Sequence, residues 1–199
     1  MVTIDLVLTN VHNEKIQAQA RPFDPIQDVL SYYIDWFPLM YNLAGQPLYQ
    51  DSHWKITKYW EGIHGLTNFD IIIIEAQNRI QGYVTIKLDH IDIYKQKSVY
   101  IPFVATAPWN RNLTEKETRE FTDIGKILLA LAGLNGYKNQ RAKSIELHSL
   151  SHAENFYKRL GMVETGNLKG RMKEFHLNES GLANLILSSK RYIKLKALD

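Results

Sequence analysis

The side chains best suited to chemistry lie close together in the last third of the chain. Tyr157 is a phenol, and a phenol with a pKa near ~10 stays protonated at neutral pH, so it can act as a general acid. Glu146 and His148 stand two residues apart on a predicted strand and share one face, and His152 follows that strand. A histidine, with an unperturbed pKa of ~6.5, is suited to act as a general base. No spacing forces these roles, because Tyr157 can equally pack on an apolar stripe and each histidine can face solvent.

A second candidate region opens a predicted helix at residues 123–126, around Gly125. The N–H groups at a helix N-terminus attract an anion, and a glycine lets a ligand approach the backbone closely. Asp123 can adopt the left-handed backbone that a glycine would take, which would keep the turn and point its carboxylate outward. The alternative is an ordinary helix N-terminus, where acidic residues favour the dipole. Positive charge near this helix start is supplied by Arg111, Lys116, Arg119 and Lys126.

The segment after the predicted strand 144–150 has the pattern A-x-x-F-Y-x-x-L-G-M, at Ala153, Phe156, Tyr157, Leu160, Gly161 and Met162. This pattern resembles the end of a GCN5-related N-acetyltransferase (GNAT) domain, in which a strand leads into a helix of this composition. The segments A-P-W-N-R at 107–111 and L-H-S-L at 147–150 look like one subgroup of these enzymes. The resemblance extends over about residues 69–177 and leaves residues 1–65 without a matching motif.

The resemblance implies an α/β (α+β) fold with a mixed, mostly antiparallel central sheet, flanked by helices, whose central strands are splayed. It implies one acyl-CoA domain over residues 1–199, with a less typical segment at about 1–65 and a C-terminal helical extension at about 181–199. The length agrees with a single domain. The splayed strand would be 99–106, because Pro102 cannot donate to a ladder and belongs at an edge or a bulge.

The resemblance also implies an activity, the acetyl-CoA-dependent transfer of an acetyl group directly to a small-molecule or peptide amine. Tyr157 would protonate the leaving thiolate, and Glu146 or His148 would accept the proton of the amine. Acetyl-CoA would be the co-substrate. The residues implied to bind it are Val104, Thr106, Asp123, Ile124, Gly125, Lys126 and Asn155.

The phosphate-binding loop departs from the family pattern [QR]-x-x-G-x-[GA], of which only Gly125 matches. Glu120 and Asp123 stand where Arg or Gln and the first glycine are usual, and a carboxylate repels a phosphate. The alternative function is therefore a non-catalytic sensor or interaction module that binds acyl-CoA.

Composition limits the other classes of function. The 199 residues include no cysteine, which excludes disulfides, thiolate metal sites and a covalent cysteine intermediate, and no motif predicts a metal site. A net charge of +3 is too small to predict a nucleic-acid partner. Because no apolar run approaches the ~20 residues that span a bilayer and no signal peptide is evident, we expect a cytoplasmic protein without a membrane partner.

Hydrophobic periodicity predicts the elements of the N-terminal half. Strands at 2–8 and 15–20 form a hairpin, and a helix capped by Asp24 stops near Pro38. A second helix at 52–60 carries aromatic side chains that serve as core or as walls of the acceptor site. Residues 69–76 indicate a central strand covered on both faces, and 80–88 a half-buried antiparallel partner. The apolar residues at helical spacing on the first helix are Ile26, Val29, Leu30, Tyr33, Ile34 and Phe37.

In the C-terminal half the pattern predicts a helix at 119–134 that is closed by the glycines at 133–136. Closing strands lie within 162–177, with a turn near 166–170, and a terminal helix follows at 181–195. Its apolar face, with Leu182, Leu185 and Ile186, must be covered by the same chain or by a homodimer contact.

Overall fold

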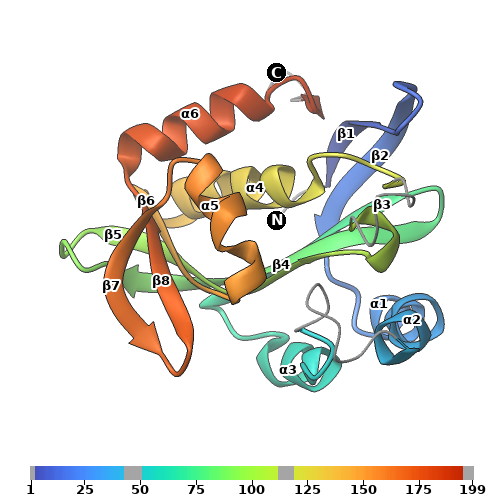
Figure 1. The fold of residues 1–199 in the computed structure, drawn as a ribbon, viewed down its shortest axis with the longest axis horizontal. Coiled ribbons are helices and arrows are strands. Elements are labelled where there is room, and N and C mark those ends of the chain that lie inside the picture. Colours follow the sequence, from blue (N-terminus) through green and yellow to red (C-terminus); the bar gives the residue numbers. More distant parts are fainter. Residues whose placement is uncertain (1–2, 43–50, 112–118, 195–199) are drawn as a thin grey trace.

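One mixed sheet organises the computed structural model, which describes residues 3–42, 51–111 and 119–194. Within these ranges the strand order is β7-β8-β6-β5-β4-β3-β2-β1-β9 (Figure 1). Neighbouring strands are antiparallel, except that β5 and β6 are parallel. The predicted mixed, mostly antiparallel sheet is confirmed. Its strands are β1 (Ile4–Thr9), β2 (Lys15–Pro22), β3 (Phe69–Ala76), β4 (Arg79–Ile91), β5 (Lys97–Thr106), β6 (Ser144–Ser149), β7 (Val163–Lys169), β8 (Met172–Leu177) and β9 (Ile193–Lys194).

Helices cover both faces of this sheet (Figure 1). The helices α4 (Ile124–Gln140), α5 (Glu154–Arg159) and α6 (Glu179–Ser189) lie on one face, and α1 (Gln27–Ser31), α2 (Phe37–Asn42) and α3 (Ile56–Ile63) lie on the other. A large aliphatic core fills the space beneath α4 and α6. The opposite core is aromatic, with Trp36 and Trp60 packed on Tyr83 at ring-centroid distances of 5.5 and 4.8 Å.

The aromatic layer explains one wrong prediction. Residues 80–88 were expected to be half-buried, but Gln81 and Thr85 are completely buried, because α1 to α3 cover the face that looked polar. The expectation for β3 is confirmed, since Ile72 faces the aliphatic core and Ile73 the aromatic one.

Splaying of the two parallel strands is confirmed as well. β5 and β6 pair only from Ser98 to Ile101, opposite Ser144 to Leu147. Beyond that point β5 continues to Thr106 and β6 to Ser149, but the two strands no longer pair with each other in the described structure. The β4–β5 register shifts where Pro102 lies, so the proline occupies a bulge as expected.

The N-terminal hairpin forms as predicted, although Val2 lies outside the described residues. Asp24 caps the first helix, because its carboxylate accepts from the N–H groups of Ile26 and Gln27 at 2.9 Å. The predicted stop near Pro38 is wrong, since a π-helical turn (Tyr32–Trp36) joins α1 to α2, which ends at Asn42.

The π turn accounts for the passage through the proline. The Phe37 N–H bonds to the Tyr32 oxygen five residues back, and this wider turn leaves room for the Pro38 ring, which has no N–H to satisfy. Burial along this helix does not follow the apolar residues at helical spacing. Tyr32, Trp36 and Met40 are buried instead, and the exposed positions are Ile26, Leu30, Tyr33, Ile34 and Phe37.

Tertiary contacts move two other helices from their predicted places. The 52–60 helix begins only at Ile56, because the residues after Asp51 form a turn. The 119–134 helix begins at Ile124 and continues through its glycines to Gln140. A Cβ on Gly136 would lie 2.0 Å from Val99 Cγ2, so this glycine permits close packing and does not end the helix.

At the C-terminus, α6 packs on α4 of the same chain, and Leu182 and Leu185 are buried there. The predicted helix to residue 195 is too long. It ends at Ser189, and β9 pairs with β1 at the far edge of the sheet; Leu195 lies outside the described residues. The closing hairpin turns after Lys169, and Gly166 lies in an irregular part of β7 with φ of 88°.

Candidate functional site

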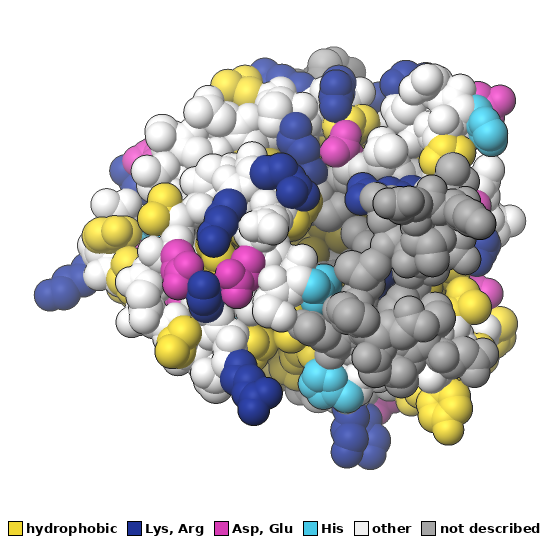
Figure 2. Space-filling model, in the orientation of Figure 1, with side chains coloured by type: hydrophobic (Ala, Val, Ile, Leu, Met, Phe, Trp, Pro, Cys, Tyr) yellow, Lys and Arg dark blue, Asp and Glu magenta, His cyan; other side chains and the backbone are white. Residues whose placement is uncertain are grey.

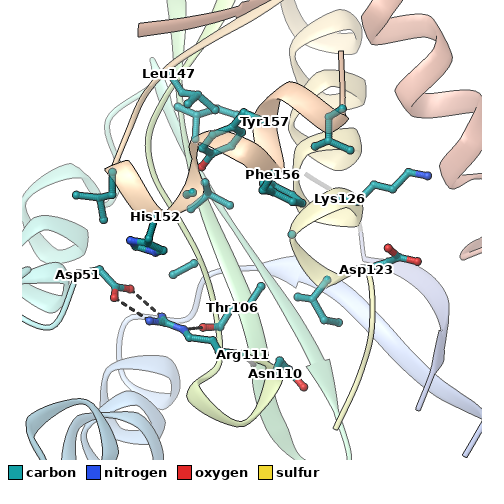
Figure 3. A pocket seen from close by; sticks show the side chains of 18 of the residues that line it. Asp51, Thr106, Asn110, Arg111, Asp123, Lys126, Leu147, His152, Phe156 and Tyr157 are labelled. Carbon is teal, nitrogen blue, oxygen red and sulfur yellow. Dashed lines mark hydrogen bonds and ion pairs between the residues drawn. The ribbon is translucent and has the colours of Figure 1, made fainter. Parts of the chain in front are cut away.

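The candidate site is the slot between β5 and β6 beyond the point where the two strands separate. The cavity measures about 440 Å³ and extends from the turn at Asp51 to the start of α4 and the inner side of α5 (Figure 3). Eight of the residues predicted for function line it: Val104, Thr106, Asp123, Ile124, Gly125, Lys126, His148 and Tyr157. Figure 2 shows that Lys and Arg side chains gather on this face of the molecule.

The start of α4 presents backbone N–H groups to the slot. Asp123 has φ 61° and ψ 9°, the left-handed conformation expected of it, and its carbonyl accepts the bond from Ile127 N–H at 2.9 Å. The N–H groups before Ile127 therefore have no partner within the helix. Gly125 lies against Phe156, whose ring would be 3.1 Å from a Cβ at that position. A helix start of this kind can hold an anionic group.

The acidic side chains near this helix start are engaged elsewhere. The Asp123 carboxylate accepts from the Tyr192 hydroxyl and from Arg191 Nη2 at 3.4 Å, and it points away from Tyr157 (Figure 3). Glu120 Oε2 lies 3.8 Å from Arg79 Nη1, an ion-pair distance. The expectation that Asp123 keeps the turn and points outward is confirmed. Lys126 and Arg159 line the slot with positive charge, whereas Lys116 lies outside the described residues.

Tyr157 brings a phenol into the slot from α5. Its ring packs on Phe156 and Phe175 at centroid distances of 5.2 and 5.8 Å, and the side chain is almost completely buried. Burial raises the pKa of this phenol. Its hydroxyl makes no hydrogen bond to any other described residue, and it points toward the centre of the slot (Figure 3). The Tyr157 hydroxyl is therefore a proton donor that a ligand in the slot can reach.

His148 borders the slot on the β6 side. Its Nδ1 lies 3.0 Å from the Tyr100 hydroxyl, and its Nε2 is 4.0 Å from Glu174 Oε1. The other oxygen of Glu174 accepts from Thr165 and Asn167 at 2.7 Å, which holds the carboxylate in place. Burial lowers the pKa of His148 below its usual range. The imidazole is therefore oriented and stays neutral at neutral pH.

Two predicted residues do not reach the slot. Glu146 lies on the same face of β6 as His148 but is buried away from the cavity, where it bonds to His90 Nε2 at 2.6 Å and lies 3.4 Å from His176 Nδ1. Asn155 is exposed on α5 and does not line the cavity. Within the described ranges, no group of three or more His, Asp or Glu side chains is arranged to hold a metal ion.

The sequence analysis missed a cluster on the other side of the slot. Arg111 donates from Nη1 and Nη2 to the two carboxylate oxygens of Asp51 at 2.8 Å. It also donates from Nε to the backbone carbonyl oxygen of Thr106 at 3.0 Å (Figure 3). His152 lies beside this pair, and Trp54 contacts Phe103 with ring centroids 4.7 Å apart. Asp51 and Arg111 are 60 residues apart, so no local spacing could have indicated the pair.

Comparisons with known proteins agree with this geometry. No protein-family model matches the chain, and no curated protein matches it by sequence. Among solved structures, spermidine N-acetyltransferase from Vibrio cholerae in complex with CoA and spermine superposes with a TM-score of 0.55 at 15% identity, over 84% of this chain and 98% of that one. Apo FdhC, described as a nucleotide-linked sugar GNAT, gives 0.61 at 10% identity, over 97% of this chain and 100% of the other.

A protein from Desulfovibrio desulfuricans assigned to the GNAT family gives a TM-score of 0.56 at 13% identity, over 81% of this chain and 99% of its own. At such identities the likeness concerns the fold. No helix in the described ranges is long and apolar enough to cross a membrane. The splayed parallel pair, the helix start beside it and these superpositions lead to one conclusion: the chain has the fold of the GCN5-related N-acetyltransferases.

Proposed function

We propose that this protein is an acetyl-CoA-dependent N-acetyltransferase that moves the acetyl group directly to an amine. The observation that carries the proposal is Tyr157, whose ring is buried while its hydroxyl reaches the slot between the splayed strands, where it has no hydrogen-bond partner among the described residues. A hydroxyl that a packed ring holds in one direction is available to a bound ligand.

The slot fits the chemical parts of acetyl-CoA. The open edge of β5 around Val104 can pair with the amide groups of the pantetheine arm as a further strand would, whereas the backbone oxygen of Thr106 already accepts from Arg111 Nε. The pyrophosphate fits the N–H groups at the start of α4, where Gly125 has no side chain and Lys126 adds positive charge. Asp123 does not oppose this, because its carboxylate is bound by Tyr192 and Arg191.

Acetyl-CoA supplies the activated thioester, and the residues of the slot stabilise charge and move protons. A backbone amide of the splayed strand stabilises negative charge on the carbonyl oxygen. Tyr157 holds a proton for the departing sulfur, and its raised pKa keeps that proton in place over a wide pH range. His148 or His152 accepts the proton of the amine. The chain has no cysteine, which excludes an acetyl-cysteine intermediate, and the transfer proposed here passes directly from the thioester to the amine.

The acceptor is a small-molecule or peptide amine. The complex of a structural neighbour with CoA and spermine supports the use of CoA in this fold, and FdhC extends the acceptors in the fold to nucleotide-linked sugars. Neither neighbour determines the acceptor of this chain.

The second candidate function is a non-catalytic module that binds acyl-CoA. The observation that favours it is the atypical start of α4, where Asp123 and Glu120 replace the usual residues of the phosphate loop. A sensor would bind acetyl-CoA without needing an oriented base or acid.

Calorimetric titration with acetyl-CoA, followed by a screen of polyamines, amino sugars, amino acids and peptides for release of free CoA thiol, tests both functions. Saturable binding together with amine-dependent thiol release supports the enzyme. Tight binding with no turnover on any amine replaces the enzyme by the sensor, and no binding at millimolar acetyl-CoA removes both.

A further inference from the structure

The most exposed apolar surface of the described structure lies on the outer side of the helix formed by α1, the π turn and α2. Along the chain, its first residues are mainly aliphatic and its last two are aromatic. The residues of this surface, here called the outer stripe, are Ile26, Leu30, Tyr33, Ile34, Phe37 and Tyr41, and between 44 and 82% of each is exposed. Part of it is visible as hydrophobic side chains at the lower right of Figure 2, over α1 and α2.

Packing on the sheet does not require these residues. The inward positions recur every four residues, at Asp28, Tyr32, Trp36 and Met40. All four are buried, and Tyr32 and Trp36 belong to the aromatic core. The π turn produces this spacing, because it inserts one residue into the regular helical period. The outer stripe is therefore an additional apolar face and not a badly packed core.

The size of the outer stripe is that of an interface. Taking about 150–250 Å² for a fully exposed residue of this kind, the exposed fractions amount to roughly 550–900 Å². Patches on ordinary monomers reach about 300–600 Å², and a stable dimer buries about 800 Å² from each partner, of which the rim supplies part.

We infer that the outer stripe is a self-complementary interface that pairs this chain with a second copy. In a two-fold dimer whose axis is perpendicular to these helices, the helices run antiparallel, so the aliphatic end around Ile26 and Leu30 lies against the aromatic end around Phe37 and Tyr41 of the other copy. The aromatic end is already ordered, because the rings of Phe37 and Tyr41 stack at 6.1 Å with an angle of 30° between them.

Charge distinguishes this occupant from a membrane surface. Helices that lie on membranes carry Lys or Arg on their polar face. Residues 26–42 contain neither, and of the two acids there Asp28 is buried in an ion pair with Arg21. An uncharged surface without basic flanks fits an identical surface better than an anionic lipid layer.

The interface leaves the catalytic slot open, because no residue of the outer stripe lines that cavity. Dimer formation and cofactor binding are therefore separable. If the proposed enzymatic function fails, the dimer is unaffected, and the reverse also holds.

Sedimentation velocity of the full chain tests the inference up to about 100 µM, where a micromolar dimer is well populated. We expect twice the mass of one chain for the unmodified protein. Ile34→Glu, and independently Ile26→Glu, should raise the dissociation constant at least ~100-fold, because each dimer would bury two unpaired carboxylates. Circular dichroism and acetyl-CoA binding should stay unchanged, since both side chains point to solvent.

Leu168→Glu is the matched control, because Leu168 is 66% exposed on β7 and lies outside the outer stripe; it should remain a dimer. A monomeric unmodified protein at the highest concentration overturns the inference, and so does a dimer that neither outer-stripe variant weakens. Binding of the unmodified monomer to phosphatidylcholine vesicles that Ile34→Glu abolishes would assign the face to a membrane and reject the second copy.

Discussion

Tyr157 combines a deeply buried ring with an available hydroxyl, and the chemistry proposed for the slot depends on that combination. Its ring lies between Phe156 and Phe175, which fixes its direction, while the oxygen faces the cavity. A phenol in this position loses little flexibility when it donates a proton, because packing has already oriented it. The same burial raises its pKa, so it remains a donor in alkaline solution.

Replacement of Tyr157 by Phe tests the acid directly. The ring and its packing remain, and only the proton donor is lost, so we expect kcat to fall about 10²- to 10⁴-fold while acetyl-CoA binding changes little. Steady-state kinetics with the best amine of the screen, together with calorimetry, measure the two effects. Phe156→Leu is the packing control. Full kcat in Tyr157→Phe over the whole pH range would exclude the acid role.

His148 gives a prediction about pH. Burial disfavours its charged form and lowers its pKa, so the neutral imidazole persists to lower pH than in an exposed histidine. We expect kcat/KM to be maintained as the pH falls through ~6.5 and to decline only below it. Tyr100→Phe removes the partner of Nδ1 and should lower kcat at all pH values by loosening the ring.

Three variants assign the base. His148→Gln should abolish the acidic limb of the profile and slow the reaction about 10²-fold or more, whereas His12→Gln, in an exposed turn of the N-terminal hairpin, should change nothing. If His152→Gln removes the limb and His148→Gln does not, the base lies on the Asp51 side of the slot.

For single residues, the sequence predicts local backbone conformation and strand face well, but it does not predict which side chains reach the cavity. Asp123 was expected in a left-handed turn, and it has that conformation, because only a few side chains tolerate it. Glu146 and His148 were correctly placed on one strand face, yet only His148 borders the cavity. The difference arises from β4 and β8, whose His90 and His176 enclose Glu146, and no local pattern reports such neighbours.

Among the elements, strands were predicted more accurately than helices. β3 has the predicted bounds because eight residues with a continuous apolar run determine a central strand by themselves. Helix ends depended on contacts distant in sequence. α4 passes through Gly133 and Gly136 because Leu182 and Val99 fill the space that side chains there would occupy.

Gly136→Ala tests whether this glycine is needed for packing. Alanine favours a helix, but its Cβ would meet Val99 Cγ2 at 2.0 Å, and a β-branched side chain on a buried strand cannot move away. We expect a net destabilisation of about 1–3 kcal/mol in urea unfolding. Gly62→Ala in α3 is the matched control, because nothing lies within 4 Å of that Cβ; it should be stabilised by roughly 0.5–1 kcal/mol. Equal stabilisation of both variants would show that α4 does not pack closely enough on Val99 to exclude a methyl group at position 136.

On the scale of the whole molecule, the sheet separates two cores that the sequence did not distinguish. The aromatic side chains of the N-terminal segment were expected to serve as core or as acceptor walls. Trp60 is in the core, buried on Tyr83, and Trp54 borders the slot, where its acceptor role stays a prediction. The Asp51–Arg111 pair joins the aromatic layer to the end of β5. Such links between layers depend on the complete fold, which is why composition and periodicity did not reveal them.

Because the slot is built from β5, α4 and α5 together, its ligand should stabilise the whole fold. Acetyl-CoA at 100 times its dissociation constant would add about 2.7 kcal/mol, or roughly 5–11 °C in Tm for a chain of this size. CoA should act almost equally, since it keeps the pantetheine and the pyrophosphate, and pantetheine alone should act much less. Differential scanning fluorimetry measures all three.

Gly125→Val should remove most of that shift. Its side chain would enter the space beside the Phe156 ring, now 3.1 Å from an ideal Cβ, and would obstruct the N–H groups at the start of α4. Tm without ligand should fall only slightly, because the Phe156 ring is half-buried and can move by a few tenths of an ångström. A full ligand shift in Gly125→Val would place the pyrophosphate elsewhere, and an equal shift with pantetheine alone would show that the start of α4 contributes nothing to binding.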